Sequence, residues 1–339
     1  MQIQVDYVEK DTRITLKLGN DLNRRDVTGG LANQQHVANW GLARISHKQW
    51  RESSDYFYDD TAGNGVRVYV VDSGIRCTHQ EFQPGRAVWG TNLVAGSPDT
   101  DEFGHGTHVA GTVGGATYGV AKKATLVAIK VLDINGEGAI GQLLAGIDFA
   151  IRDAEALGVA NSSVINISLG AKLDPSINEA VDVAVNVHGM TVAVAAGNDH
   201  EDSTNYSPAS APSVLTVGAI VGTSFPSAFT NFGPIVDIYA PGVSILSAGI
   251  ENDNATRYLS GTSQGGFNIG TIWLSMRGLT FNYMYAAAPH VAGLAAYFIA
   301  KEGLSGAAVA QRVINAAVPT TAPEGPIQNY LIAYNDSGK

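Results

Sequence analysis

Four polar residues of the types used in acyl transfer follow apolar segments or lie among glycines. Asp72 closes the run VYVVD, His105 lies in EFGHGTHVAGT, Asn198 ends VAVAAGN, and Ser263 lies in SGTS. In nucleophilic catalysis a His takes the Ser proton, and an Asp orients the His. A side-chain amide such as that of Asn198 can donate to the developing oxyanion, which stabilises the transition state by about 2.7–4 kcal/mol. Together these residue types favour acyl-transfer chemistry.

Each of these residues also has a structural explanation when it is taken alone. Asp72 is typical of a turn or a helix cap, and a single His105 is more often structural than catalytic. His105 and His108 in HGTH are three residues apart, whereas two zinc ligands on one helical face are typically four apart. The sequence offers no third ligand for a zinc site. The chemical prediction therefore depends on the combination of residues.

Apolar, β-branched runs alternate with helical periodicity from Trp40 onward, and such runs are typical of parallel strands covered on both faces. The expected strands are RVYVVD (67–72), TLVAIKVLD (125–133), SVINISLG (163–170), MTVAVAAGN (190–198), VLTVGAI (214–220) and IVDIYAPG (235–242). The expected helices are 105–117, 140–157, 174–188, 288–302 and 305–317. This alternation predicts an α/β fold in one domain, with a mostly parallel central sheet flanked by helices.

The candidate residues end several of these expected elements. Ligands bind at the carboxyl ends of the strands in such sheets, and Asp72, the turn 168–170 and Asn198 end three of the strands. If a helix follows Ser263, this side chain lies at a helix N-terminus, where backbone N–H groups favour negative charge. We therefore expect these residues to meet at one edge of the sheet.

The composition excludes several classes of protein. The chain has 339 residues, 45% of them hydrophobic and 15% charged, which is enough apolar material for a large core. Its formal charge of -10 argues against a nucleic-acid partner, because phosphate binding needs a basic face. No apolar run is long enough to cross a membrane. Cys77 is the single cysteine, so no intramolecular disulfide can form.

Several motifs give the chain a specific resemblance. It resembles the subtilisin-like serine proteases, peptidase family S8, and above all the fungal secreted branch that includes proteinase K and the oryzin-type enzymes. The similarity covers 36–339 apart from 265–286, and Asp72, His105 and Ser263 follow in the chain order of subtilisin. The matching stretches are WGLARIS (40–46), YVVDSGI (69–75), HGTHVAGT (105–112), YGVAKKA (118–124), INISLG (165–170), VAAGN (194–198), NYSPASAPSVLTVGA (205–219), SGTS (260–263) and APHVAGLAAY (288–297).

The resemblance implies a subtilisin-like three-layer fold and assigns the catalytic roles. Asp72 orients His105, which is the general base, Ser263 is the nucleophile, and Asn198 lines the oxyanion hole. The implied activity is a serine endopeptidase that acts on proteins and peptides through an acyl-enzyme intermediate. No cofactor is required for this chemistry.

The resemblance also implies a substrate groove that binds peptide as an added strand. One edge is made by Ser168, Leu169 and Gly170, and the other by Gly136, Glu137 and Gly138. Ala196 and Gly197 line the pocket for the side chain before the cleaved bond. Because they are small, we expect a roomy apolar pocket and broad specificity.

A structural calcium site is implied by three residues of the same branch. The carbonyl groups of Pro212 and Val214 and the carboxylate of Asp237 are oxygen ligands of the kind that calcium prefers. An ordinary loop with an Asp at the end of a strand explains these residues equally well. Both alternatives remain open at this point.

Residues 1–35 are too few for a domain, and we expect a short strand, QIQVDYV, followed by a polar linker. The stretch VDYVEKD resembles the last strand of the inhibitor-like propeptide of the family. We interpret 1–35 as a remnant of that propeptide plus linker, in a truncated precursor or a chain with a misplaced start codon. The resemblance implies a secreted monomer inhibited by its own propeptide, with cleavage within 28–36.

Some features depart from the family pattern or compete with it. Gln264 replaces the usual Met after the nucleophile, and Val109 stands where the proteinase K branch has a cysteine. The stretch GEGAIG (136–141) fits a dinucleotide fingerprint, but no acidic residue ends the next strand. A nucleotide-binding enzyme is therefore a weaker interpretation than a substrate groove.

A segment at 265–286 interrupts the nucleophile motif. Without it, SGTSQ would join AAPHVAG directly, and the segment contains no Asp or Glu. We interpret it as an unspliced intron translated in frame, since the possible codons include splice signals, although a genuine surface insertion is the alternative. A displacement of about 1 Å can lower the rate about 10²-fold, so we expect the chain as written to be inactive or poorly folded. The rival function is a catalytically dead scaffold that binds peptides or partners.

Overall fold

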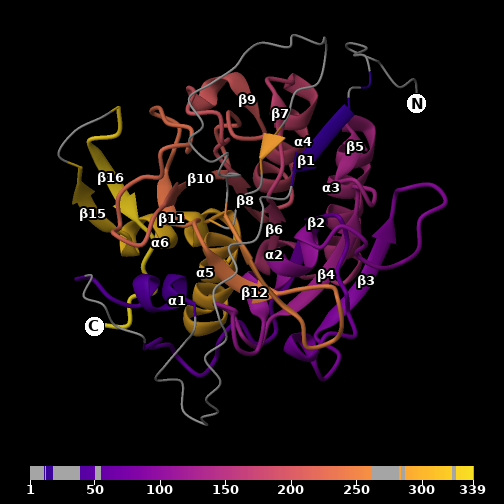
Figure 1. Cartoon of the computed structure of the whole chain (residues 1–339), viewed down its shortest axis with the longest axis horizontal. Helices are drawn as coiled ribbons and strands as arrows, with labels where there is room; N and C mark the ends of the chain where they lie inside the picture. Colours follow the sequence, from indigo (N-terminus) through magenta and orange to yellow (C-terminus); the bar gives the residue numbers. More distant parts are fainter. Residues whose placement is uncertain are drawn as a thin grey trace, which may run out of the picture.

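A nine-stranded sheet dominates the part of the chain that the computed structural model describes, which is residues 11, 13–17, 39–49, 55–260, 282–283, 287–322 and 326–338 (Figure 1). The strand order is β15-β16-β11-β10-β8-β6-β2-β4-β3. In this order the strands are Val318–Thr321, Asn329–Ile332, Ile238–Pro241, Leu215–Ile220, Thr191–Ala195, Ser163–Ile167, Arg67–Asp72, Thr125–Lys130 and Ala87–Asn92.

Eight of these described strands run parallel, from β16 at one side to β3 at the other, and β15 pairs antiparallel with β16. The six strands expected from apolar runs are all present, each within two or three residues of its expected end. The mostly parallel α/β fold predicted from the sequence is thus confirmed.

Alternation along the strands builds one apolar layer on each face of the sheet. In β2, Val68 and Val70 join one buried cluster, whereas Tyr69 and Val71 join the other. This follows from the period of two residues, by which neighbouring side chains point to opposite faces. The first face is covered by α2 (His105–Gly114), α5 (Ala287–Glu302) and α6 (Ala307–Ala316). The second is covered by α3 (Ile140–Ala156) and α4 (Pro175–Asn186).

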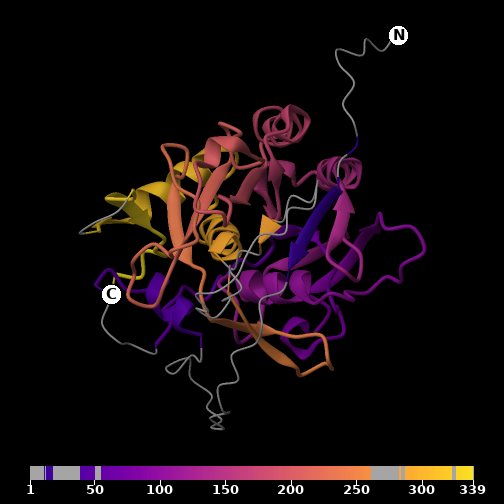
Figure 2. The same cartoon turned by 45° about the horizontal axis from the view of Figure 1, so that its top comes forward.

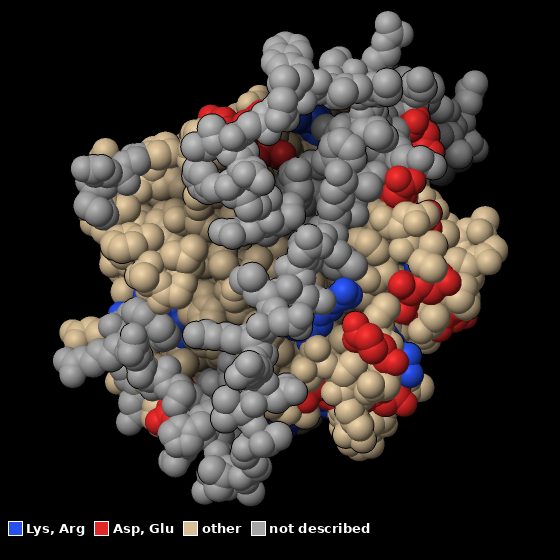
Figure 3. All heavy atoms as spheres, in the orientation of Figure 1, with Lys and Arg blue, Asp and Glu red and all other residues tan. Residues whose placement is uncertain are grey.

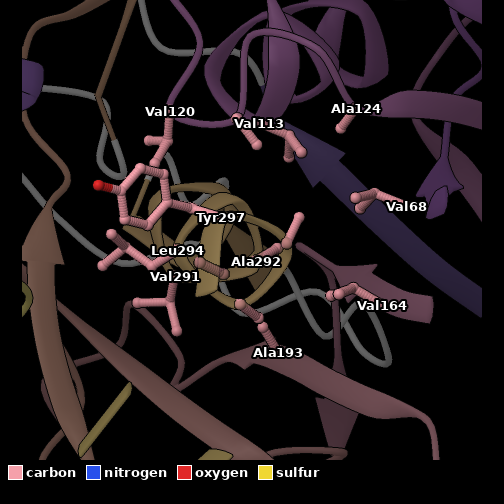
Figure 4. Packing of buried hydrophobic residues seen from close by; sticks show 14 of the residues in the cluster. Val68, Val113, Val120, Ala124, Val164, Ala193, Val291, Ala292, Leu294 and Tyr297 are labelled. Carbon is pink, nitrogen blue, oxygen red and sulfur yellow. The ribbon is translucent and has the colours of Figure 1, made fainter. Parts of the chain in front are cut away.

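Helix α5 lies at the centre of the larger cluster. Val291, Leu294 and Tyr297 project from it among side chains of several strands and of α2 (Figure 4). Every residue from Ala287 to Ile299 is buried, so α5 has no solvent-facing stripe in this part. A helix that is apolar all round must lie inside a core, and α5 is the element that begins where the nucleophile motif resumes.

Smaller elements complete the described chain. Helix α1 (Trp40–Ile45) begins after Asn39, whose side chain caps it, and the hairpin β12–β13 pairs Ile245–Ala248 with Thr256–Leu259. Two residue pairs, β7 (Ala171–Lys172) and β9 (Tyr206–Ser207), form a short antiparallel ladder.

One expectation about the N-terminal region is wrong. The region after residue 8 was expected to be a polar linker, yet β1 (Arg13–Lys17) is a strand. It lies between β5 (Glu137–Ala139) and β14 (Asn282–Tyr283) in a separate three-stranded sheet. Pairing with β5 explains this strand, because the segment itself has no continuous apolar run. The expected strand QIQVDYV, at 2–8, lies outside the described residues.

Candidate active site

The pair of side chains at the centre of the site comes from β2 and α2. Asp72 is the last residue of β2, and His105 is the first residue of α2. The Nδ1 atom of His105 lies 2.7 Å from Oδ1 of Asp72, and the two side chains are 1% and 0% exposed. A hydrogen bond at Nδ1 leaves Nε2 as the ring atom that can accept a proton.

The backbone around this pair is tightly packed. The N–H of Ser73 donates to Oδ1 of Asp72 at 2.7 Å, so this oxygen accepts two hydrogen bonds. A Cβ atom on Gly106 would lie 2.1 Å from the carbonyl oxygen of Gly74, which is closer than real atoms approach. Glycine at 106 therefore lets the start of α2 approach the end of β2 closely enough for the pair to meet.

Two other reactive side chains nearby are not suited to the chemistry. The Nε2 atom of His108 lies 2.9 Å from the carbonyl oxygen of Ile245, and burial lowers the pKa of His108 to about 3. This imidazole is therefore neutral at physiological pH and serves the packing of α2. Burial also raises the pKa of Cys77 to about 11, so its thiol stays protonated.

Asn198 lies in the loop that follows β8. Its side chain is only 5% exposed. Because β2, β6 and β8 are neighbouring parallel strands, Asp72, Ser168 and Asn198 all follow strand ends at the same edge of the sheet. The structure thus brings three of the expected strand-end positions to one edge.

A residue that the sequence did not single out, Asn231, braces the loop at Asn198. Its amide donates to the carbonyl of Ala196 at 3.2 Å, and its side-chain oxygen accepts the N–H groups of Asp199 and Glu201. A Cβ on Gly197, where φ is +113°, would lie 1.8 Å from this amide. Glycine at 197 is therefore required by both backbone and packing. Ala196 is fully buried.

The two expected groove edges lie at ends of strands or turns. Ser168, Leu169 and Gly170 directly follow β6, and the hydroxyl of Ser168 accepts a hydrogen bond from the amide of Asn166 at 2.9 Å. On the other edge, Gly136 has φ of +72°, and Glu137 and Gly138 begin β5. A Cβ on Gly138 would lie 2.4 Å from the carbonyl oxygen of Val131, so this edge depends on glycine.

The second of these edges carries an added strand in the structure. Strand β1 pairs antiparallel with β5, with Ile14 opposite Gly138 and Thr15 opposite Glu137 (Figure 2). On its other side β1 pairs in parallel with β14. The edge at 137–139 can thus accept an extended chain through its backbone groups.

Ser263 and the whole of 265–286 except 282–283 lie outside the described residues. Ser260, the last described residue before them, accepts a hydrogen bond from the N–H of Ser244 at 2.7 Å through its hydroxyl. The geometry reported for the site therefore concerns Asp72, His105 and Asn198.

One expected calcium ligand, Asp237, lies beside the strand that begins directly after Val214. Asp237 precedes β11, and its Oδ2 accepts the N–H of Thr216 on β10 at 2.8 Å, two residues after Val214. Carbonyl and carboxylate oxygens in this loop suit calcium, although Thr216 already occupies one carboxylate oxygen. Within the described residues there is no group of three or more His, Cys, Asp or Glu side chains that could hold a metal ion.

Comparison with known proteins decides the family. The profile of the subtilase family, Peptidase S8, matches residues 63–334. The chain belongs to the subtilase family. It is 47% identical over 304 residues to subtilisin-like protease 2 of Pseudogymnoascus destructans, covering 89% of this chain and 68% of that protein.

Other relatives agree with this assignment. Subtilisin-like protease 5 of Arthroderma gypseum is 44% identical over 306 residues, covering 90% of this chain and 70% of the relative. A crystal structure of a cold adapted subtilisin-like serine proteinase superposes with a TM-score of 0.75 at 32% identity, covering 89% of this chain and 98% of the other. The resemblance inferred from the motifs is confirmed, and the chain is a subtilase with the serine endopeptidase function of peptidase family S8.

Most of the acidic residues visible in Figure 3 lie at the right and along the top of the view, and basic residues are fewer on this face. None of the helices among the described residues is long and apolar enough to cross a membrane.

Proposed function

We propose that Asp72, His105 and Ser263 are the catalytic triad of this subtilase and that Asn198 contributes to the oxyanion hole. The observation that carries the proposal is the buried contact of 2.7 Å between Asp72 Oδ1 and His105 Nδ1. In this arrangement Asp72 fixes the tautomer of His105, so that Nε2 takes the proton of Ser263 as it attacks the peptide carbonyl. The same nitrogen then returns the proton to the leaving amine.

The substrates under this proposal are proteins and peptides that bind as an extended strand. Backbone groups of 136–138 and 168–170 would pair with the peptide, and the β1–β5 ladder supports the first of these edges. Ala196 and Gly197, being small, leave room for an apolar side chain before the cleaved bond. Broad specificity follows from a groove that recognises mainly backbone.

The N-terminal region acts in the proposal as a remnant of an inhibitor in cis. Residues 1–35 would be the propeptide remnant and linker, and 36–339 the peptidase domain. The pairing of β1 with the groove edge supports an inhibitory contact there. The working enzyme is proposed to be a secreted monomer, as its resemblance to secreted fungal enzymes indicates, with no nucleic-acid or membrane partner.

A structural calcium ion is proposed at Asp237 with the carbonyl groups of Pro212 and Val214. The ion would supply charge compensation that holds this loop, and no catalytic step involves it. A chelator should lower the melting temperature of the protein, and an Asp237→Asn variant should lose this response. An unchanged melting temperature in chelator would contradict the calcium site.

The segment 265–286 separates Ser263 from α5 and is proposed to be a retained intron that makes the chain as written inactive. The interruption itself favours the second candidate, a catalytically dead scaffold that binds peptides. The experiment compares the full chain with a variant lacking 265–286 for hydrolysis of a casein substrate. We expect turnover only after deletion, and a shortened Asp72→Asn variant should lose most of it. A folded shortened chain without turnover of any peptide would support the scaffold.

A further inference from the structure

The carboxylate of Asp101 is buried beside the candidate catalytic pair, where it accepts five hydrogen bonds from Ser73 and from residues around the start of α2. Its Oδ1 accepts from the hydroxyl of Ser73 at 2.8 Å and from the N–H groups of Phe103 and Gly104 at 3.1 and 2.8 Å. Its Oδ2 accepts from the N–H and the hydroxyl of Thr107 at 2.8 and 2.7 Å. Asp101 is 4% exposed. A buried charge with this many donors is fixed in one position.

Ser73 links this carboxylate to the other half of the pair. Its N–H donates to Asp72, and its hydroxyl accepts the N–H of Gly106 at 2.9 Å while donating to Asp101. Its carbonyl accepts a hydrogen bond from Nζ of Lys130 at 2.9 Å. Ser73 therefore contacts the strand that ends in Asp72 and the helix that begins with His105.

These contacts replace the usual cap of helix α2. The first N–H groups of a helix have no partner within it, and the N-cap residue here, Gly104, has no side chain to accept them. Ser73 accepts the N–H of Gly106 instead, and Asp101 accepts that of Thr107. The position of the first turn, and with it the ring of His105, is thus set by Ser73, which follows Asp72, and by Asp101 in the loop that leads into α2.

We propose that Asp101 and Ser73 are positioning residues that hold His105 against Asp72 in its reactive geometry. The proposal rests on the catalytic roles proposed above. A residue that only capped α2 would need no hydrogen bond to Ser73. Here Oδ1 of Asp101 accepts from the hydroxyl of Ser73 and also from the N–H groups of Phe103 and Gly104, just before His105. Removing either residue should loosen the 2.7 Å contact before it unfolds the domain.

The test measures His105 itself and needs no turnover. In the full chain with ¹⁵N-labelled histidine, NMR follows the deshielded Nδ1 proton of His105, with His105→Gln used to assign the signal. Asp101→Asn keeps the shape of the side chain but replaces the charged acceptor of the N–H groups at 104 and 107, so this signal should weaken or disappear.

Ser73 gives a milder pair of variants that keeps the test decisive if Asp101→Asn folds poorly. Ser73→Ala should weaken or remove the Nδ1 signal, and Ser73→Thr, which keeps the hydroxyl, should retain it. The matched control is Glu81→Gln at the other end of α2, where a buried carboxylate accepts the N–H groups of Thr117 and Tyr118. It should lower the melting temperature without changing the Nδ1 signal of His105.

Two outcomes would overturn the proposal. An unchanged Nδ1 signal in both Asp101→Asn and Ser73→Ala would show that the Asp72–His105 pair does not depend on Asp101 and Ser73. Equal changes in Glu81→Gln would show a general loosening of α2. Because the readout is independent of turnover, failure of the proposed protease function would appear separately, as a shortened chain with an intact His105 signal and no hydrolysis.

Discussion

Helix α2 is anchored by a buried carboxylate at each end, Asp101 before its first residue and Glu81 beyond its last. Asp101 accepts N–H groups at 104 and 107, and one Glu81 oxygen accepts those of Thr117 and Tyr118 at 2.7 and 3.2 Å. Both carboxylates provide acceptors for backbone N–H groups at the ends of the helix. A buried backbone N–H without a partner would destabilise the fold by about 1–3 kcal/mol.

The two ends differ in what else the carboxylate contacts. Asp101 also binds Ser73, the residue after Asp72, whereas Oε2 of Glu81 accepts the backbone N–H groups of Thr117 and Tyr118 in a loop. Near Glu81, the ammonium of Lys122 donates to the carbonyl of Thr117 at 2.8 Å. On the role proposed for Asp101, the same anchoring contact sets reaction geometry at one end of the helix and only closes a loop at the other. Substitutions at the two ends should therefore separate activity from stability.

The largest expected difference in kcat is between substitutions of the two histidines of α2, His105 and His108. In the shortened chain, His105→Ala should lower kcat by about 10⁶-fold, as removal of the equivalent base does in subtilisin. His108→Ala removes a buried hydrogen bond and should lower the melting temperature while leaving most of the activity per folded molecule. Peptide hydrolysis and thermal unfolding measure the two effects. Comparable kcat losses in both variants would contradict the assigned roles.

Alanine in place of Gly106 or Gly114, at the two ends of α2, should give the next largest difference in kcat. At 106 the new Cβ would lie 2.1 Å from the carbonyl oxygen of Gly74, whereas at 114 it would lie 3.1 Å from the side chain of Leu126 and 3.2 Å from the carbonyl oxygen of Ala121. Gly106→Ala should displace His105 and lower kcat at least about 100-fold. Gly114→Ala should destabilise by about 1–3 kcal/mol with little change in kcat. If Gly114→Ala lowered kcat as much, the distinction between the ends would fail.

The smallest expected effect on kcat is at Lys122, whose substitution should change how the stability of the protein depends on pH. Burial lowers the pKa of Lys122 to about 7, so the unfolded chain binds more protons than the folded chain between pH 7 and about 10.5. The free energy of unfolding should therefore rise with pH in this window, and Lys122→Met should lose about 3–4 kcal/mol of that rise between pH 7 and pH 10. Denaturant unfolding at pH 7 and pH 10 measures it, with the pH profile of kcat unchanged. Parallel stability curves for both proteins would argue against the burial effect.

The strands that could be predicted from the sequence are those that are buried on both faces and therefore consist of continuous apolar runs. The strands β2, β4, β6 and β8 are uninterrupted apolar runs because both of their faces are buried. Strand β3 was missed, since five of its six residues are only partly buried and its pattern is that of an edge. Strand β1 was missed because its pairing partner, β5, lies more than 100 residues away.

The site was predictable only in part for a related reason. Asp72 and His105 are recognisable by type and motif, and the structure brings them into contact. Asp101, Ser73 and Asn231 are polar residues in loops. The sequence does not distinguish a polar loop residue that faces water from one that binds a distant backbone group. Their partners lie as far as 28 to 35 residues away, so only the folded arrangement reveals their function.

The central claim is that the Asp72–His105 pair activates Ser263. Labelling with a fluorophosphonate, followed by mass spectrometry of the peptide that contains Ser263, tests it most directly. We predict stoichiometric labelling of Ser263 in the chain lacking 265–286, little labelling in the full chain, and almost none in the shortened His105→Ala variant. A folded shortened chain that does not react, or one that reacts equally well without His105, would contradict the account.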